Sequence, residues 1–189
     1  MPSPAHRRRY TLTDYLEVEE LSPAVKHELV DGEIFAMAGG TVEHAALSTS
    51  ISALLVAKLR GGPCRAYSSD LRIRILEASI ATYADVTVVC DPVERDPESP
   101  THVTNPRVVI EVLSKSTESY DRDEKRLYYQ QLQSLGEYVL VAQDRRRVEV
   151  WRRAGDAWAH SIHEAGAKVP LSSIGVELDV NEIYEVAGL

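Results

Sequence analysis

The chain has 189 residues, 44% of them hydrophobic and 26% charged, and it carries a formal net charge of −8. This length suits one domain with one core, so we expect a single domain over residues 1–189. No run of about 18 apolar residues occurs, which argues against a membrane partner, and the acidic balance argues against wholesale electrostatic binding to nucleic acid.

The N-terminus and the cysteines bear on where the protein resides. Residues 1–10 include three consecutive arginines and are expected to form a disordered basic tail. No apolar segment follows, so we expect no signal peptide. Cys64 and Cys90 belong to no CxxC motif, which predicts two separate thiols rather than a zinc site. Isolated thiols without a secretory signal indicate a cytoplasmic protein.

The first half of the chain is predicted to contain helices and strands. Thr13 and Thr41 are placed to cap helices through their side-chain oxygens, and Asp31-Gly32 is the two-residue turn typical of a β-hairpin. Alternating apolar residues indicate strands after the second helix. The predicted elements are a helix over 13–20, a hairpin over 27–37, a helix over 41–60, and strands over 65–76 and 84–90.

The second half is predicted to contain the central strands and the closing elements. Residues 91–106 are rich in proline and polar side chains, and we expect a long loop there, the most mobile part of the chain. The remaining predicted elements are strands over 108–113, 137–143, 147–153 and 157–163, and helices over 121–134 and 180–187. A helix between two strands of a central sheet indicates the α/β class with a mixed sheet.

One carboxylate lies inside the most apolar stretch of the chain. Residues 108–113 read Val-Val-Ile-Glu-Val-Leu, which is typical of a strand buried on both faces. Removing water from the ionised Glu111 costs several kcal/mol or more unless a cation or hydrogen bonds replace it. Glu111 therefore needs a positive partner, which a lysine, a metal ion or both would supply.

Asp85 stands at the start of the preceding predicted strand. If the two strands pair, Asp85 and Glu111 face each other across about 5 Å. Two carboxylates this close repel each other unless a cation lies between them or one of them is protonated. A divalent ion such as Mg²⁺, which prefers oxygen ligands, would resolve the repulsion. A salt bridge or a shared proton is the alternative.

Lys125 lies on the apolar face of the helix predicted over residues 121–134. That face consists of Lys125, Tyr128, Tyr129 and Leu132. A lysine that faces the core is rarely unpaired, and this helix directly follows the Glu111 strand. Lys125 would therefore orient a nucleophile or neutralise charge beside a metal ion. The alternative is a buried ion pair with Glu111 that does no chemistry.

Five short motifs occur in a characteristic order: Glu28-Leu29-Val30-Asp31-Gly32-Glu33, Ser69-Asp70-Leu71-Arg72, Ala84-Asp85-Val86, Glu111-Val112-Leu113-Ser114 and Asp121-(x3)-Lys125-(x2)-Tyr128. In this order they resemble the family often labelled Uma-two, whose members are grouped with restriction endonucleases. It is a bacterial branch of the PD-(D/E)xK nuclease superfamily. The resemblance extends from about Leu12 to the final helix.

The resemblance implies a restriction-endonuclease-like fold, a mixed central sheet flanked by helices, here with an N-terminal β-hairpin and a C-terminal β-hairpin extension. It also implies hydrolysis of nucleic-acid phosphodiesters with Mg²⁺ or Mn²⁺ held by Asp85 and Glu111. Three departures stand out. Ala84 replaces the usual proline, Leu113 stands where the motif has its lysine, and Lys115 stands where this branch usually has a proline. In this branch the lysine is taken to have moved to the following helix, as Lys125.

Further side chains are assigned to the site or to the substrate. Glu28 resembles an extra acidic ligand that the superfamily supplies from its N-terminal segment, with an exposed hairpin carboxylate as the alternative. His44 could face the same cleft, with capping or packing as the alternative, and Arg72 or Arg74 could simply neutralise Asp70. The accessory candidates are His44, Asp70 and Lys115, and the candidate phosphate contacts are Arg72, Arg74, Arg145 and Arg147.

We therefore expect a divalent-metal-dependent endonuclease that hydrolyses phosphodiester bonds in DNA. Cutting both strands needs two sites, so we expect a homodimer. The alternative is a catalytically inactive nucleic-acid- or protein-binding module on the same fold, which the net charge of −8 and the missing motif lysine favour. An RNase on the same metal site is a further alternative, although the chain has few aromatic residues for stacking bases.

Overall fold

The structure is a computed structural model in which residues 9–189 are described. The predicted basic tail therefore lies outside the described residues, except for its last two. Of these, Tyr10 donates its backbone N–H to the carbonyl of Gly32 over 2.7 Å, which ties it to the turn of the first hairpin. Within residues 9–189, no helix is both long and apolar enough to cross a membrane.

A six-stranded mixed sheet forms the centre of the molecule, in the order β11-β10-β9-β8-β6-β3. Its strands are β3 (Cys64–Ser68), β6 (Val86–Cys90), β8 (Pro106–Val112), β9 (Glu137–Val141), β10 (Arg147–Ala154) and β11 (Ala157–Glu164). Only the β8–β9 pair is parallel among the pairs of this sheet. The parallel pair is possible because helices connect the two strands, as the sequence predicted.

A five-stranded sheet lies beside it, in the order β2-β1-β5-β4-β7. Its strands are β1 (His27–Val30), β2 (Glu33–Ala36), β4 (Arg72–Ile75), β5 (Ile80–Tyr83) and β7 (His102–Val103). The hairpin β1–β2 confirms the predicted turn, in which Asp31 and Gly32 both have positive φ angles, 51° and 76°. A separate pair, β12 (Lys168–Leu171) and β13 (Val176–Asp179), was not predicted.

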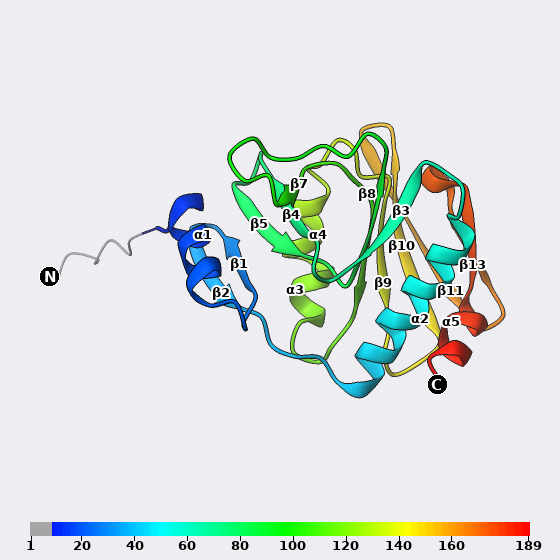
Figure 1. Cartoon of the computed structure of the whole chain (residues 1–189). Helices are drawn as coiled ribbons and strands as arrows, with labels where there is room; N and C mark the ends of the chain where they lie inside the picture. Colours follow the sequence, from blue (N-terminus) through cyan, green and yellow to red (C-terminus); the bar gives the residue numbers. More distant parts are fainter. Residues whose placement is uncertain (1–8) are drawn as a thin grey trace, which may run out of the picture.

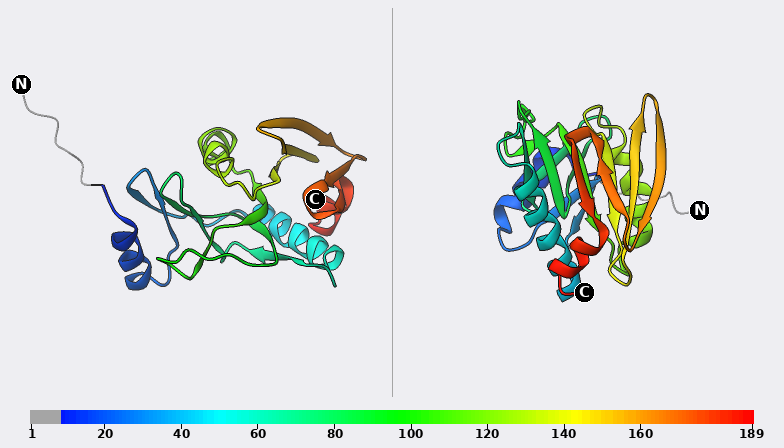
Figure 2. Two further views of the ribbon diagram at one scale, coloured as in Figure 1. Left: turned by 90° about the horizontal axis from the view of Figure 1, so that it is seen from above. Right: turned by 90° about the vertical axis from the view of Figure 1, so that its right-hand side faces the viewer.

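Helices cover both faces of the six-stranded sheet. They are α2 (Val42–Lys58), α3 (Glu118–Arg122), α4 (Glu124–Tyr129) and α5 (Val180–Val186), with a 3₁₀ turn at Ser172–Ile174. The helix α1 (Leu12–Leu21) packs instead on the five-stranded sheet, where Tyr15 shares a small core with Leu29 and Ala81. The apolar residues of α2 and α5 share one core with the sheet, and Tyr129 of α4 belongs to a second core on the opposite face. Figures 1 and 2 show α2 and α5 on the side away from α3 and α4. This arrangement confirms the predicted α/β class.

The structure corrects three predicted boundaries. Thr11, not Thr13, caps the first helix, and it forms a reciprocal capping box with Asp14. The strand predicted over 65–76 is two strands, β3 and β4, which belong to different sheets. The helix predicted over 121–134 is two short helices that meet at Asp123, whose φ and ψ of −108° and −86° are not helical.

The segment 91–106 is largely irregular, as predicted, but part of it packs against the five-stranded sheet. It contains β7, and it buries Asp96 and His102 at 2% and 0% exposure. The His102 Nδ1 atom lies 2.7 Å from the Ser99 hydroxyl, and Arg74 Nε lies 3.3 Å from Asp96 Oδ2. The predicted long loop is therefore confirmed apart from this short strand, it is anchored to the five-stranded sheet through Asp96, and its mobility stays a prediction.

The prediction of two separate thiols is wrong. Cys64 and Cys90 are directly opposite each other in the antiparallel pair β3–β6, and their sulfur atoms form a disulfide. The two cysteines are 26 residues apart in sequence, so their contact could not be predicted without the pairing of β3 with β6. The argument from free thiols to a cytoplasmic location therefore loses its basis.

Reducing this disulfide is expected to lower the free energy of unfolding by about 3 kcal/mol, because the covalent loop no longer restricts the unfolded chain. Urea denaturation with and without dithiothreitol measures the change. The double variant Cys64→Ser/Cys90→Ser is the control, and its urea midpoint is expected to be the same with and without dithiothreitol. A wild-type midpoint that dithiothreitol leaves unchanged would contradict a disulfide at this position.

Candidate active site

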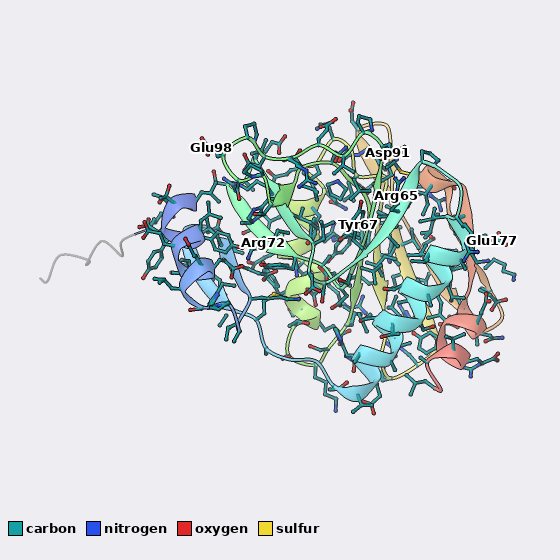
Figure 3. The ribbon with its side chains drawn as sticks, viewed as in Figure 1. Arg65, Tyr67, Arg72, Asp91, Glu98 and Glu177 are labelled. Carbon is teal, nitrogen blue, oxygen red and sulfur yellow. A yellow bond between two sulfur atoms is a disulfide. The ribbon has the colours of Figure 1, made fainter. Side chains whose placement is uncertain are left out.

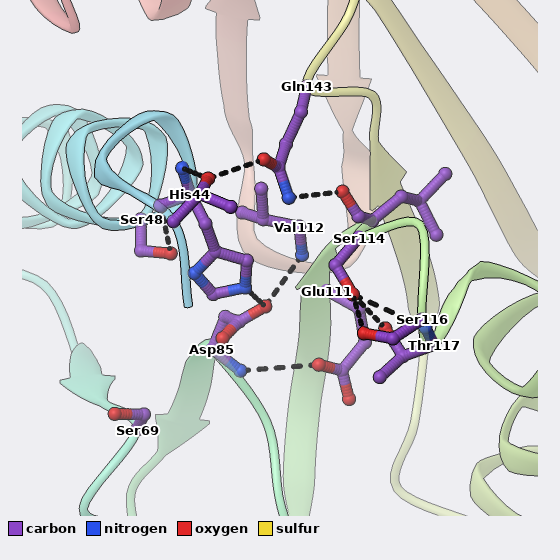
Figure 4. Close-up of polar contacts among 12 residues, drawn as sticks. His44, Ser48, Ser69, Asp85, Glu111, Val112, Ser114, Ser116, Thr117 and Gln143 are labelled. Carbon is purple, nitrogen blue, oxygen red and sulfur yellow. Dashed lines mark hydrogen bonds and ion pairs between the residues drawn. The ribbon is translucent and has the colours of Figure 1, made fainter. Parts of the chain in front are cut away.

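Asp85 and Glu111 lie side by side at the centre of the six-stranded sheet. Asp85 directly precedes β6, Glu111 lies in β8, and the two strands pair with Val86 opposite Ile110. The Asp85 amide N–H donates to Glu111 Oε2 over 3.4 Å. The Asp85 carboxylate in turn accepts the Val112 N–H at Oδ2 over 2.7 Å. The predicted adjacency of the two carboxylates is confirmed, and Figure 4 shows both.

The Lys125 ammonium lies between two carboxylates from different elements. Its Nζ atom is 3.1 Å from Glu111 Oε1 and 3.2 Å from Glu28 Oε1. The prediction that Lys125 faces the core is confirmed, because the residue is only 7% exposed. Glu28 of β1 is held by the Thr82 hydroxyl and by the Tyr83 N–H. The hairpin, β8 and α4 therefore meet at one ammonium group.

Negative charge exceeds positive charge in this cluster. Four carboxylates, those of Glu28, Asp85, Glu111 and Asp121, line the cleft around the single buried ammonium of Lys125. Burial raises the pKa of Glu111 well above its usual value, and the Lys125 charge only partly opposes this. Burial lowers the pKa of Lys125, but Glu111 and Glu28 outweigh it and raise that pKa well above its usual value. Both groups thus favour their protonated forms, Glu111 chiefly because it is buried and Lys125 because carboxylates surround it.

The histidine predicted as an accessory residue also reaches the cluster. His44 lies in the first turn of α2, and its Nε2 atom is 3.1 Å from Asp85 Oδ2. The hydrogen bond with Asp85 raises the pKa of His44 above its usual value, although burial opposes this. His44 therefore faces the cleft rather than only capping or packing α2.

Sequence reasoning missed three side chains of the site: Asp121, Tyr120 and Gln143. Asp121 is 4% exposed, and burial raises its pKa above the usual value while Lys125 opposes the rise. Its place in the motif Asp121-(x3)-Lys125 could have revealed it, although the structure puts Asp121 in α3 and Lys125 in α4, on either side of the non-helical Asp123. Gln143 donates its amide to the Leu113 carbonyl over 2.6 Å, a contact that no local pattern indicates.

These side chains line an open cleft of about 810 Å³. Its polar and charged lining is contributed by Glu28, Thr41, Glu43, His44, Asp85, Glu111, Ser114, Lys115, Ser116, Thr117, Glu118, Tyr120, Asp121, Lys125, Gln143 and Asp144. A cleft with several convergent charged groups and shifted pKa values is the usual setting of an active site.

Asp70, Arg72 and Arg74 lie away from this cleft. Asp70 forms an ion pair with Lys26 over 2.6 Å, so the predicted neutralisation by Arg72 or Arg74 is wrong. Arg72 donates to Glu19 over 2.8 Å and to the Tyr83 hydroxyl over 2.9 Å. Figure 3 labels Arg72 on the side of the molecule that carries α1.

Arg74 is 7% exposed and donates to the Ile80 carbonyl over 2.8 Å. A guanidinium buried in this way cannot reach a phosphate, so the expected phosphate contact is corrected for Arg74. Arg147 lies 3.2 Å from Glu149 Oε1, and neither residue lines the cleft. Lys115 and Arg145 are exposed, Lys115 at the cleft and Arg145 next to Asp144, which lines it.

The donor set suits a hard divalent cation. Among residues 9–189, no three His, Cys, Asp or Glu side chains already form a metal-binding group. Mg²⁺, however, usually takes only one or two protein carboxylates and keeps several waters. Glu111 Oε1 is buried, and within the described part of the chain its charged partner is the Lys125 ammonium, 3.1 Å away. The other oxygen, Oε2, faces Asp85, and two neighbouring carboxylates with one ammonium between them and Glu28 fit the ligand set of a divalent cation.

Comparisons with known proteins identify the family of the chain. Residues 12–181 match the model of the family Uma2, which is described as "Putative restriction endonuclease". The uncharacterized protein slr1290 of Synechocystis sp. is 38% identical over 172 residues, which are 90% of this chain and 89% of that protein. The uncharacterized protein sll1609 of the same organism is 34% identical over 146 residues, 77% and 82% of the two chains.

One solved structure has a similar fold. A crystal structure from Anabaena variabilis, described as "a putative nuclease belonging to DUF820", superposes with a TM-score of 0.76. The match covers 94% of this chain and 98% of the other, at 19% sequence identity. At that identity the similarity establishes a shared fold, and it confirms the expected restriction-endonuclease-like architecture.

Substituting Lys125→Met is expected to lower the free energy of unfolding by about 3–5 kcal/mol at pH 8, because it leaves buried carboxylates without their cation. The raised pKa of Glu111 would rise further. The folded protein would then bind more protons than the unfolded chain, so stability falls as the pH rises from about 4.3 through that raised pKa. The loss is therefore expected to be smaller at pH 5 than at pH 8.

Urea denaturation at the two pH values measures this difference. Lys115→Met is the matched control, because it removes an exposed lysine of the same cleft. An equal loss of stability at both pH values would show that Lys125 does not compensate ionised carboxylates.

Proposed function

This chain belongs to the Uma2 family, and from that premise we propose that it is a divalent-metal-dependent endonuclease that hydrolyses phosphodiester bonds in DNA. The observation that carries the proposal is the contact of Asp85 with Glu111 beside the buried ammonium of Lys125. Two carboxylates and one lysine in a cleft are the groups that metal-assisted phosphodiester hydrolysis requires.

Asp85 and Glu111 are the proposed metal ligands, with Glu28 as an additional one. When bound, Mg²⁺ or Mn²⁺ supplies a Lewis acid that neutralises the scissile phosphate and makes a water molecule more acidic. The excess negative charge of the cleft supports this assignment, because a divalent cation would neutralise it. The Glu111 carboxylate, whose Oε1 atom is in contact with the Lys125 ammonium, would provide an oxygen for such an ion.

Lys125 is proposed to orient the attacking water and to offset charge that develops on the phosphate. Its raised pKa keeps the amine protonated, so it acts as a hydrogen-bond donor rather than as a base. Glu28 and Glu111 fix the position of the ammonium from two sides. A fixed donor of this kind stabilises developing charge without reorganising during the reaction.

The acidic cleft leaves few groups for the DNA backbone. Lys115 lines the cleft and Arg145 follows its rim residue Asp144, so these two exposed cations are the proposed phosphate contacts. Cleaving both strands of a duplex needs two active sites, and a homodimer is the proposed assembly.

A catalytically inactive binding module on the same fold is the second candidate. Leu113 favours it, because this buried apolar residue stands where the nuclease motif has a lysine. Lys125 in this case would only balance the charge of Glu28 and Glu111. Calorimetry with Mn²⁺ separates the candidates, since an inert charge cluster that holds no ion would give no binding heat.

The substrate can be identified by incubating the protein with plasmid DNA, single-stranded DNA or RNA, each with and without Mg²⁺ or Mn²⁺, and measuring cleavage. Cleavage of DNA is expected only with the metal. Asp85→Asn and Glu111→Gln are each expected to lower the rate by more than about 100-fold, which is the upper range for residues that merely support a ligand.

Asp70→Asn is the matched control, because Asp70 is an exposed carboxylate that pairs with Lys26 outside the cleft. Its rate is expected to equal that of the wild type. Cleavage that persists in both Asp85→Asn and Glu111→Gln would contradict the proposed site, whatever the substrate.

A further inference from the structure

The position of the Asp85 carboxylate depends on two contacts at a single oxygen. Asp85 Oδ2 accepts the Val112 N–H over 2.7 Å and lies 3.1 Å from His44 Nε2, as Figure 4 shows. Within the described part of the chain, Asp85 Oδ1 has no such partner. The two contacts thus hold Oδ2 against Val112 and His44, and they leave Oδ1 available for a cation in the cleft.

We propose that His44 is a positioning residue, which orients Asp85 for metal binding, and that Gly40 is required so that the imidazole ring can occupy its place. This inference rests on the proposed function, because it assumes that Asp85 holds a cation. The inference assigns a role in the site to α2, a helix that supplies none of the proposed metal ligands. Groups that hydrogen-bond to a metal ligand typically change metal affinity by about 10–100-fold when they are removed.

The start of α2 is fixed relative to the metal-ligand strand. Thr41 caps the helix by accepting the His44 N–H over 3.2 Å. The Thr41 hydroxyl also donates to Gln143 Oε1 over 2.8 Å, and Gln143 donates to the Leu113 carbonyl over 2.6 Å. Leu113 is two residues beyond Glu111. This chain of contacts sets the distance between the His44 ring and the strand that carries Glu111.

The backbone before the helix leaves no room for a side chain at one position. A Cβ atom added to Gly40 would lie 2.7 Å from His44 Nδ1 and 2.9 Å from its Cγ atom. A Cβ atom added to the neighbouring Gly39 would meet nothing within 4 Å. Neither glycine is among the residues with positive φ, so backbone conformation does not explain the difference. Gly40 therefore admits the ring, and Gly39 has no such role.

An ion pair that merely stabilises the fold is the competing explanation, and metal affinity separates the two. In apoprotein titrated with Mn²⁺ by calorimetry, His44→Leu is expected to raise the Kd by about 10–100-fold. His44→Gln keeps an N–H donor at about the same reach as Nε2 and is expected to restore most of the affinity. The thermal midpoints of the two apoproteins are not expected to show this loss in His44→Leu and recovery in His44→Gln.

His160→Leu is the matched control for the loss of a histidine. His160 Nε2 lies 3.3 Å from Glu149, a comparable histidine–carboxylate pair that lies outside the cleft. Its Kd for Mn²⁺ is expected to equal that of the wild type. If His160→Leu raises the Kd for Mn²⁺ as much as His44→Leu does, the effect comes from general destabilisation, and the positioning role is overturned.

Gly40→Ala and Gly39→Ala test the same idea with the imidazole kept in place. Gly40→Ala is expected to displace the ring and to raise the Kd for Mn²⁺ several-fold, whereas Gly39→Ala is expected to match the wild type. Wild-type affinity in both His44→Leu and Gly40→Ala would overturn the inference.

The same titrations distinguish this failure from failure of the proposed function. If the wild type binds Mn²⁺, Asp85→Asn does not, and the His44 and Gly40 variants bind normally, the inference fails while the metal site stands. If the wild type binds no Mn²⁺, or if Asp85→Asn binds it normally, both the inference and the proposed function fail.

Discussion

A single ammonium group, that of Lys125, connects the elements from which the site is built. It lies within 3.2 Å of Glu28 on the first hairpin and of Glu111 on the central strand β8. Charges this deeply buried are stable only when each has partners. Because the cluster contains more carboxylates than cations, the fold retains negative charge at its centre, at a cost in stability that favours binding of a further cation.

Strand pairing turns this charge cluster into a site with a defined geometry. The pairing of β6 with β8 places Asp85 next to Glu111, and the Asp85 carboxylate is held by the Val112 N–H. The helix α2 approaches the same point from the other side and brings His44 to Asp85. The two proposed ligands are thereby supported by backbone and helix contacts, which would orient them for a metal ion.

The sequence predicted the parts of the site that depend on burial. Glu111 and Lys125 stood out because charged residues in apolar stretches need partners, and Asp85 followed from strand pairing. Contacts between distant segments were not predictable from local patterns. The His44 contact spans 41 residues between positions 44 and 85, the Cys64–Cys90 disulfide joins two strands, and Arg74 is buried against a segment that looked like a loop.

The central claim is that Asp85 and Glu111 together hold a divalent cation beside Lys125. A crystal of the protein soaked in Mn²⁺ and measured for anomalous scattering tests this claim most directly. The account predicts a single strong peak between the two carboxylates, at the roughly 2.0–2.2 Å separation from their oxygens that small divalent ions adopt. No peak at saturating Mn²⁺, or a peak only elsewhere on the molecule, would contradict the account.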